Sequence, residues 1–397
     1  MTGLRTERKS VLVLTHNFPR FSGDVSGVFL RHLLLSLTDS FDFTVVAPHD
    51  KGLPDIEEMD GITVRRFRYA SDDRENIAYR GEMHTRVKSN PIGVLRFLRS
   101  YSKAARGDVA GSPFDAIWAH WWIPGGWAGL KSKGVLDVPL VVTCHGTDIF
   151  LLNKFSWLKP LAKKIFSAAD RITVVSNFLK NQLVGIMESS VDGVEQKISV
   201  APMPVDDEVF FFDPELQAVH GSILSASRLT AQKHLDKLIR AGARLRDDGI
   251  EFDMAVYGDG PERQKLLQLI QDLDLSDHVR IHNPVPQAEL AGIYRKSEIA
   301  ALVSEHEGFG LMLQEAMLCG CAGVGADSGG ITDMIAEDGR DGILVQPRDA
   351  DALYSALKSL LTDRERLSKL RESGRRSAEK RFSGAELTEI FRTILNA

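Results

Sequence analysis

Apolar residues fall into short runs along the chain, and polar stretches with helical spacing separate many of these runs. Near-continuous apolar strands that alternate with helices are typical of parallel sheets covered on both faces. A first series of expected strands covers 10–16, 42–48, 61–67, 115–121, 139–146, 171–176 and 198–203. A second series covers 221–227, 252–258, 279–285, 297–303, 322–327 and 342–347.

The two series of strands indicate two domains of the same class. They meet near the segment PMPVDDEVFFFDPE (202–215), where three prolines interrupt regular structure. We therefore predict an α/β protein with two Rossmann-like, doubly wound domains that face each other across a cleft. The first domain is expected over 1–205 and the second over 206–382, with a last helix at about 383–397 that packs back on the first domain.

Polar and glycine-containing motifs directly follow several of the expected strands. In open α/β sheets the ligand crevice lies at the carboxyl ends of the strands, so these motifs are the candidate sites. They are HNFPRFSGDVSG (16–27), HWWIPGG (120–126), HGTD (145–148), RLTAQK (228–233) and EHEGFGLMLQEAM (305–317). A cleft between the two domains would bring them together.

The segment 305–317 combines a glycine-flanked aromatic residue with the start of a helix. Free backbone N–H groups at such a helix start attract a phosphate or diphosphate. Glu315, about one turn into the helix, is placed to accept hydrogen bonds from a diol such as a ribose, while Glu307 can face another part of the same ligand. Arg228 and Lys233 supply cations that suit two oxygens of a diphosphate. Jointly, these residues favour nucleotide binding over separate surface or capping roles.

Other chemistries find less support. YGDGP (257–261) has two of the three glycines of a dinucleotide fingerprint, and a proline enters where that pattern needs a compact helix start. The carboxylate pairs Asp272/Asp274 and Asp349/Asp351 lie away from the candidate sites, so we expect no metal. The sequence has no GxSxG motif, no P-loop and no plausible context for a cysteine nucleophile, so hydrolase and kinase functions are unsupported.

The composition suits a two-domain protein of a reducing compartment. The chain has 397 residues, 43% of them hydrophobic, and its three cysteines lack the spacing of a disulfide framework or a zinc site. No window approaches the roughly 18 to 20 apolar residues of a membrane span, and no export signal is visible. We therefore expect a cytoplasmic protein.

Charge is divided unevenly between the halves. Residues 1–205 carry 26 basic and 21 acidic side chains and residues 206–397 carry 23 and 33, which gives net charges of +5 and −10. The basic excess lies largely in 61–106, which includes the expected helix SNPIGVLRFLRSYSKAARG. Its apolar part would be Val94, Leu95, Phe97, Leu98 and Tyr101, and its basic part Arg96, Arg99, Lys103 and Arg106. Either this helix is a solvated face packed on the core, or it attracts an anionic membrane or an acidic, lipid-linked acceptor; nucleic acid is not an expected partner.

In combination, the motifs resemble a known family. SEHEGFGLMLQEAMLCG, SASRLTAQK, YGDGP, DSGGITDMI, HGTD and ADRITVVSNF are similar to segments of the retaining glycosyltransferases of the large GT-B family 4, and the similarity covers nearly the whole chain. The resemblance implies GT-B architecture. It also implies transfer of a hexose-type sugar from a nucleoside diphosphate sugar to an acceptor hydroxyl, with retention of configuration and without a metal or other cofactor.

The resemblance also implies roles for individual residues. It gives the catalytic group as His145, Glu307, Arg228 and Lys233, with Glu307 on the donor sugar and the two cations on its diphosphate. It gives the donor-binding group as Glu315 on the ribose, Gly308, the main chain of Phe309, Gly310 and Leu311, and the loop residues Ser22 and Gly23. His16, His120 and Asp148 are assigned to the acceptor side.

Some loops depart from the family pattern. His234 stands where glycine usually follows the lysine, and MPVD (203–206) stands where NGVD is common. We expect an enzyme of cell-surface polysaccharide or glycolipid synthesis. The alternatives are a catalytically idle subunit that binds a sugar nucleotide, and a glycosyltransferase with a small soluble acceptor. The base and sugar of the donor are not specified by the sequence, because closely similar scaffolds accept different donors.

Overall fold

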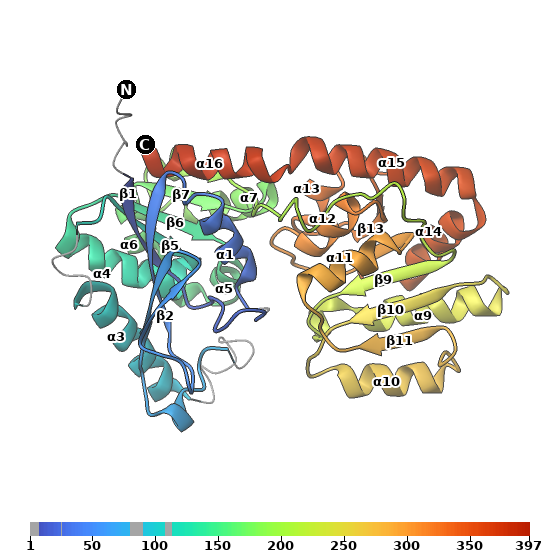
Figure 1. Cartoon of the computed structure of the whole chain (residues 1–397), viewed down its shortest axis with the longest axis horizontal. Coiled ribbons are helices and arrows are strands. Elements are labelled where there is room, and N and C mark those ends of the chain that lie inside the picture. The colour runs from blue at the N-terminus through green and yellow to red at the C-terminus, as the bar shows by residue number, and fades with distance from the viewer. Residues whose placement is uncertain (1–7, 25, 80–89, 108–112) are drawn as a thin grey trace. The chain divides into compact units, whose positions relative to one another are not determined.

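The computed structural model describes residues 8–24, 26–79, 90–107 and 113–397, and the chain divides into two compact units (Figure 1). The first unit comprises Met1–Val175, Leu179–Met203 and Leu387–Ala397, and the second comprises Ser176–Phe178 and Pro204–Glu386. Each unit is an α/β fold with a sheet between helices. The main division therefore falls two residues before the boundary expected at 205, and the chain returns to the first unit at its end.

The sheet of the first unit has eight strands in the order β3-β4-β2-β1-β5-β6-β7-β8. The strands are β1 (Lys9–Leu14), β2 (Phe41–Pro48), β3 (Ile56–Met59), β4 (Ile62–Phe67), β5 (Ala116–His120), β6 (Leu140–Cys144), β7 (Arg171–Val174) and β8 (Ile198–Val200). Each strand except β3 lies within or next to an apolar run of the sequence. The edge strand β3 pairs antiparallel with β4. Its residues IEEM are exposed or half-buried, which explains why the sequence has no apolar run at these positions.

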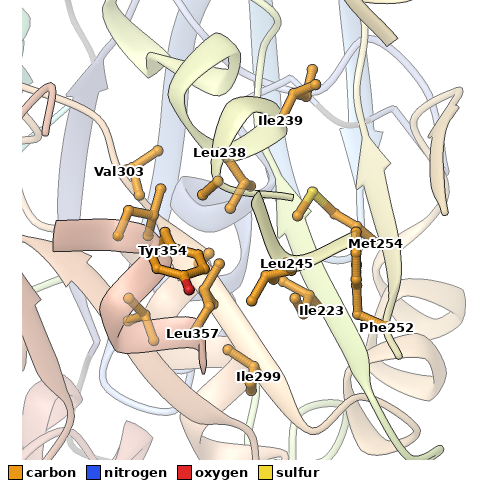
Figure 2. Close-up of a cluster of buried hydrophobic side chains, with 14 of the residues drawn as sticks. Ile223, Leu238, Ile239, Leu245, Phe252, Met254, Ile299, Val303, Tyr354 and Leu357 are labelled. Carbon is orange, nitrogen blue, oxygen red and sulfur yellow. The ribbon is translucent and has the colours of Figure 1, made fainter. Parts of the chain in front are cut away.

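The sheet of the second unit has six strands in the order β11-β10-β9-β12-β13-β14, and all of its pairings are parallel. The strands are β9 (Ser222–Ala226), β10 (Asp253–Tyr257), β11 (Val279–His282), β12 (Ile299–Leu302), β13 (Ala322–Ala326) and β14 (Ile343–Val345). Figure 2 shows part of the core beside this sheet, where Leu245 of one helix lies next to the strand residue Ile223, and Tyr354 and Leu357 of another helix belong to the same buried cluster. The strands β12 and β13 are buried at every position, so both faces of the sheet are covered there, which explains the near-continuous apolar runs.

Helices follow most of the strands. In the first part of the chain they are α1 (Val28–Leu35), α3 (Pro91–Gly107), α4 (Trp127–Leu136), α5 (Thr147–Lys154), α6 (Lys159–Ala168), α7 (Asn177–Met187) and α8 (Val194–Lys197), with short turns at η1 (Asp72–Arg74), η2 (Trp121–Gly126) and η3 (Ser156–Leu158). In the second they are α9 (Leu235–Asp247), α10 (Arg263–Asp272), α11 (Gln287–Arg295), α12 (Leu311–Leu318), α13 (Ile331–Met334), α14 (Ala350–Thr362), α15 (Arg364–Arg381) and α16 (Gly384–Asn396), after the turn η4 (Ala231–Lys233).

The last helix, α16, contributes to the first unit through the residues after Glu386. Phe391 is fully buried with its ring 5.4 Å from that of Trp118 on β5. Thr388 donates a hydrogen bond to Ser36 over 3.0 Å, and Arg392 pairs with Asp39. An apolar contact flanked by polar ones thus holds the end of the chain on this unit.

Helix α3 has one buried face and one basic face. Phe97 and Tyr101 are buried, and the Tyr101 ring stacks on Phe67 with centroids 4.6 Å apart. Leu95, expected in the apolar part, is instead 48% exposed, because only part of the apolar stripe meets the core. The basic residues Arg96, Arg99, Lys103 and Arg106 are exposed, and residues 80–89 of the basic segment lie outside the described residues. Among the described residues, no helix combines the length and apolar character needed to cross a membrane.

Candidate functional site

In the second unit, the loop after β12 carries a half-buried ion pair. Glu307 accepts a hydrogen bond from the Ser304 hydroxyl over 2.6 Å and pairs with Lys233. Burial alone would raise the pKa of the Glu307 carboxyl, but the charges of Lys233 and Arg228 and the hydrogen bonds outweigh it and hold the pKa below its usual value. Glu307 is therefore ionised at neutral pH. Ser304 was not among the predicted site residues, although it lies only three positions before the glutamate.

Two glycines of DSGG explain the shape of this loop. The N–H of Gly330 donates to the carbonyl oxygen of Glu307 over 2.9 Å. A Cβ atom on Gly329 would lie 2.5 Å from the Glu307 carbonyl oxygen, and one on Gly330 would lie 2.3 Å from that of Gly308. Only glycine permits so close an approach of two backbone segments. The Ser176 hydroxyl fixes the loop from another side, donating to the Gly308 carbonyl over 2.6 Å.

The same loop leads into helix α12. Gly310 has a left-handed backbone with φ 103°, which favours glycine, and the helix begins at Leu311. The Phe309 side chain is buried against the Phe382 ring, 5.3 Å between centroids. Phe309 can therefore offer only its backbone to a ligand, as the predicted main-chain role requires. The first N–H groups of an α-helix have no partner within the helix and are suited to an anion.

Glu315 lies one turn into α12 in a mainly apolar environment. The Tyr294 hydroxyl donates to its carboxyl over 3.4 Å, and burial raises the pKa of Glu315 to about 8. A carboxyl group with so little solvation has unused hydrogen-bonding capacity, which a diol can fill. Glu315 and Glu307 thus differ in environment: one is weakly solvated, and the other is ion-paired.

Basic side chains gather at the ends of neighbouring strands in this unit. Arg228 follows β9 and is exposed, while Lys233 lies in η4 with its side chain 13% exposed. The next residue, His234, has φ 48°, so a side chain here occupies the left-handed conformation that glycine adopts most easily. Its ring lies 3.4 Å from the carboxylate of Glu305, which Arg348 also contacts at 2.6 Å. This second ion pair was not predicted, because its members are 43 positions apart.

In the first unit, three histidines meet at the ends of β1, β5 and β6. The Nδ1 atom of His120 lies 3.0 Å from Nε2 of His145, and the His145 ring lies 4.2 Å from that of Trp121. His16 packs edge-on against Trp121, with centroids 4.4 Å apart. Burial lowers the pKa of His16 to about 4 and that of His145 to about 3, so both rings are neutral at physiological pH.

Two of the residues expected on the acceptor side, His120 and Asp148, are buried. Asp148 is 1% exposed, and its carboxylate accepts hydrogen bonds from the backbone N–H groups of Trp122, His145 and Gly146 over 3.0 to 3.1 Å. His120 is fully buried. The carboxylate holds two loops and the imidazole is hydrogen-bonded to His145, so both side chains have structural partners, and their acceptor-side roles stay predictions. His16 is half-buried.

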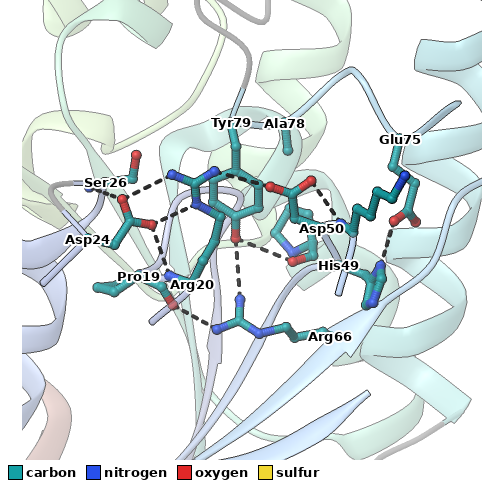
Figure 3. A network of polar contacts seen from close by, with 12 residues as sticks. Pro19, Arg20, Asp24, Ser26, His49, Asp50, Arg66, Glu75, Ala78 and Tyr79 are labelled. Atoms are coloured by element: carbon teal, nitrogen blue, oxygen red, sulfur yellow. Dashed lines mark hydrogen bonds and ion pairs between the residues drawn. The ribbon is translucent and has the colours of Figure 1, made fainter. Parts of the chain in front are cut away.

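The predicted loop 22–27 is anchored by a network of charges (Figure 3). Arg20 binds both carboxylate oxygens of Asp24, over 2.7 and 3.1 Å, and also contacts Asp50 over 3.1 Å. Ser22 and Gly23 are exposed between these anchors, and residue 25 lies outside the described residues. Further along, Gly27 has φ 70°, and a Cβ atom there would lie 2.5 Å from the Asn17 carbonyl oxygen. The loop is therefore fixed at its base and presents its tip to solvent.

The carboxylate pairs have structural partners. Asp349 caps α14 by accepting from the N–H groups of Asp351 and Ala352, both over 2.9 Å. Asp351 pairs with Arg244, and Asp272 accepts from Gln268 over 2.9 Å. Elsewhere in the described chain, His49, Asp72 and Glu75 have ligand atoms close enough to hold a metal. Both His49 ring nitrogens are already bonded, to Glu75 over 2.5 Å and to the Leu53 carbonyl over 2.8 Å, so this cluster is better described as a structural ion pair.

Comparison with known proteins identifies the family. Residues 26–209 match the model of glycosyltransferase family 4, and residues 207–377 match the model of glycosyl transferases group 1. The chain belongs to the family 4 glycosyltransferases. Both models meet at the boundary between the units, and the second contains the charged site built on β9 and β12.

Relatives and solved structures agree with this family. An N-acetyl-alpha-D-glucosaminyl L-malate synthase of Bacillus anthracis is 27% identical over 290 residues, which cover 70% of this chain and 74% of the relative. A GDP-mannose-dependent phosphatidylinositol monomannoside mannosyltransferase of Mycolicibacterium smegmatis is 25% identical over 405 residues, covering 96% and 97%.

Among solved structures, a sucrose-phosphate synthase of Thermosynechococcus elongatus has a TM-score of 0.80 at 18% identity, covering 98% of this chain and all of the other. Anabaena HepE in complex with UDP-glucose has a TM-score of 0.72 at 18% identity, covering 98% and 99%. At these identities the likeness shows the fold, and it confirms the predicted GT-B architecture.

Proposed function

We propose that this family 4 glycosyltransferase transfers a hexose-type sugar from a nucleoside diphosphate sugar to an acceptor hydroxyl, with retention of configuration and without a divalent metal. The observation that carries the proposal is the Lys233–Glu307 pair beside Ser304 and the start of α12. It places a cation, a carboxylate and free helix N–H groups at adjoining ends of parallel strands, which suits a sugar joined to a diphosphate.

The proposed chemistry follows from these groups. When the glycosidic bond breaks, negative charge grows on the leaving diphosphate, and Arg228, Lys233 and the start of α12 stabilise it where other enzymes use a metal ion. Glu307 binds a hydroxyl of the donor sugar, and Glu315 binds the ribose. His145 contacts the transferred sugar, and the leaving phosphate accepts the proton of the attacking hydroxyl in a front-face substitution.

The names of the relatives support an anionic acceptor. One acts in the synthesis of a glucosaminyl L-malate and the other on a phosphatidylinositol monomannoside, and both malate and phosphatidylinositol carry negative charge. The first half of this chain has a net charge of +5. We therefore favour an acceptor with a carboxylate or phosphate, in cell-surface polysaccharide or glycolipid synthesis.

The test of the proposal is turnover of a panel of donors. Purified protein is incubated with UDP, GDP, ADP and dTDP sugars, with and without anionic acceptors, and nucleotide release and the anomer of the product are measured. We expect release from one donor class, unchanged by EDTA, and loss of that release in Glu307→Gln. Tight donor binding without release would instead identify an idle sugar-nucleotide-binding subunit, and rescue by a divalent ion after EDTA would contradict the metal-free mechanism.

A second part of the proposal is peripheral contact with an anionic membrane on the cytoplasmic side, through the basic face of α3. Arg96, Arg99, Lys103 and Arg106 are exposed there beside Ile92, which is 65% exposed, so charge and apolar surface are both available to a bilayer. Each such charge contributes about 1 kcal/mol at most. At low salt the wild type is expected to sediment with anionic liposomes, and the variant with these four basic residues changed to Gln is expected to stay in the supernatant. A wild type that does not bind anionic liposomes would indicate a soluble acceptor.

A further inference from the structure

We propose that His120 is a positioning residue for His145: its Nδ1–H donates to Nε2 of His145, which leaves the proton of His145 on Nδ1, available as a hydrogen-bond donor to the transferred sugar. The inference rests on the proposed function, in which His145 contacts that sugar. It assigns a purpose to a fully buried histidine that cannot itself reach a substrate.

The two rings are held in a defined arrangement. His120 ends β5 and His145 follows β6, and these strands pair in parallel with His120 opposite Thr143. The ring nitrogens are 3.0 Å apart, and the ring planes meet at 30°. Trp121 and Phe29 contact the His145 ring at 4.2 and 5.5 Å between centroids. The aromatic contacts limit movement of the ring, and the hydrogen bond sets its rotation.

The backbone around the pair is also constrained. Trp121 has φ 62°, a left-handed conformation that is uncommon for a bulky residue. Asp148 stabilises this turn by accepting from the Trp122 N–H over 3.0 Å, and it accepts from the His145 N–H over 3.1 Å. One buried carboxylate therefore fixes both histidine-bearing loops relative to each other.

The position of the shared proton follows from the other nitrogen of His120. Its Nε2 atom is buried and has no hydrogen-bond partner in the described part of the chain. If His120 accepted the hydrogen bond, neutral His120 would carry its proton on Nε2 as a buried donor without an acceptor, an arrangement that is rare and costly. If His120 donates from Nδ1, Nε2 carries only a lone pair. The second arrangement leaves no buried N–H unpaired, and we assign it.

The assignment determines what His145 can do. With Nε2 accepting from His120, the single proton of the neutral His145 ring lies on Nδ1. Nδ1 is not among the fully buried unpaired atoms, so it remains open to a ligand. Burial lowers the pKa of both histidines, which supports neutral rings. His145 then donates a hydrogen bond to a sugar oxygen and does not remove a proton, in keeping with a mechanism in which the leaving phosphate is the base.

Side-chain ¹⁵N–¹H NMR of histidine-labelled protein tests the assignment without a substrate. We expect the proton of His145 on Nδ1 in the wild type, with the resonances assigned by comparison with His120→Asn and His145→Asn. His120→Phe removes the donor, whereas the amide of His120→Asn can replace it. We therefore expect His145 to become a mixture of tautomers in His120→Phe and to keep its proton on Nδ1 in His120→Asn.

Kinetics gives the second readout. Loss of one hydrogen bond that orients His145 is expected to lower kcat about 10-fold in His120→Phe, with donor affinity changed much less and with recovery in His120→Asn. His220→Asn, at an exposed position of the second unit, is the matched control. If His120→Phe fails to fold, His120→Gln replaces it, because its longer amide does not match the position of Nδ1.

A proton on Nε2 of His145 in the wild-type protein would overturn the assignment whatever the activity. Equal kcat values in the wild type and His120→Phe, together with a reduced kcat in His145→Asn, would overturn the positioning role of His120. A His145→Asn variant with full activity would instead contradict the role of His145 in the proposed function. The NMR result on the wild type would be unaffected by that outcome, so the two failures can be told apart.

Discussion

In the second unit, the loops after β9 and β12 bring charged side chains together, whereas in the first unit the loops after β1, β5 and β6 bring together histidine and aromatic rings. The charged site contains the Lys233–Glu307 and Arg348–Glu305 pairs. The histidine site contains neutral imidazoles with depressed pKa values. One kind of site suits an anion whose charge grows during reaction, and the other suits neutral hydroxyl groups.

The contrast follows from how each site satisfies its polar atoms. In the second unit the half-buried carboxylate of Glu307 is ionised because a lysine and a serine hydroxyl compensate its burial. In the first unit no cation contacts the three histidines in the described part of the chain, so burial leaves them uncharged. The same edge of an α/β sheet can thus form an ionic or a neutral site, depending on which side chains follow the strands.

The largest expected effect is in the ionic site. Lys233→Ala should lower turnover by about 10²-fold or more while weakening donor binding much less, because the interaction strengthens as charge grows on the diphosphate. Steady-state kinetics and donor calorimetry provide the measurement, with Lys237→Ala on α9, a half-buried lysine that pairs with its neighbour Asp236, as the control. A loss of donor binding with unchanged turnover at saturating donor would show that Lys233 stabilises the ground state and the transition state equally.

In the neutral site, His145→Ala should lower turnover by about 10- to 100-fold, the scale of one or two oriented hydrogen bonds in a transition state. Affinity for the free nucleoside diphosphate should be unchanged, because the proposal places His145 on the transferred sugar, which the free nucleotide lacks. Calorimetry with the free nucleotide measures this second quantity. A weaker nucleotide complex in His145→Ala would mean that the two sites are not chemically separate.

Within the second unit, Glu315→Ala should weaken binding of the free nucleotide by about 1 to 3 kcal/mol, the value of the two hydrogen bonds that a ribose diol makes with this carboxyl group. The ribose is bound in both the ground state and the transition state, so turnover at saturating donor should change less than nucleotide affinity. Unchanged nucleotide affinity would contradict the assignment of Glu315 to the donor site. Glu307→Gln serves as the comparison, because this variant should lose turnover.

The smallest effect concerns stability. The pKa of Glu315 in the folded protein, about 8, exceeds the value of 4.5 that is usual for a glutamate, so the folded protein holds a proton that the unfolded chain loses as pH rises. This contribution is complete below pH 4.5 and is lost as pH rises through about 8. Between pH 5 and 8.5 the wild type should therefore lose about 1 to 3 kcal/mol more unfolding free energy than Glu315→Gln.

Urea unfolding at the two pH values tests the stability prediction, with Glu365→Gln on the surface as the control. The control should lose as much unfolding free energy as the wild type does, since Glu365 makes only an exposed pair with Lys369. If the unfolding free energy of Glu315→Gln changes with pH as much as that of the wild type does, the Glu315 carboxyl is exposed to solvent.

Some features of these sites can be predicted from the local sequence, and others cannot. The Glu307 and Glu315 spacing, the glycines at 308 and 310 and the two cations are readable because each follows an apolar strand or begins a helix. The Arg348–Glu305 pair and the contact of Gly329 and Gly330 with the Glu307 loop cannot be predicted in this way, because their members lie in loops after different strands and meet only in the folded unit.

The sequence by itself determined the two-series α/β fold, since burial on both sides of a parallel sheet demands apolar runs that are visible residue by residue. It also determined the candidate histidines, lysine, arginine and glutamates, because their types and order along the chain carry the family resemblance. Only the tertiary structure decided their environments. The fold buried His120 and Asp148 and paired the strand β3 with β4. It also gave Glu307 and Glu315 different environments and therefore different charges. Solvation and hydrogen-bond partners depend on residues brought together from distant parts of the chain, which is why a local pattern could not specify them.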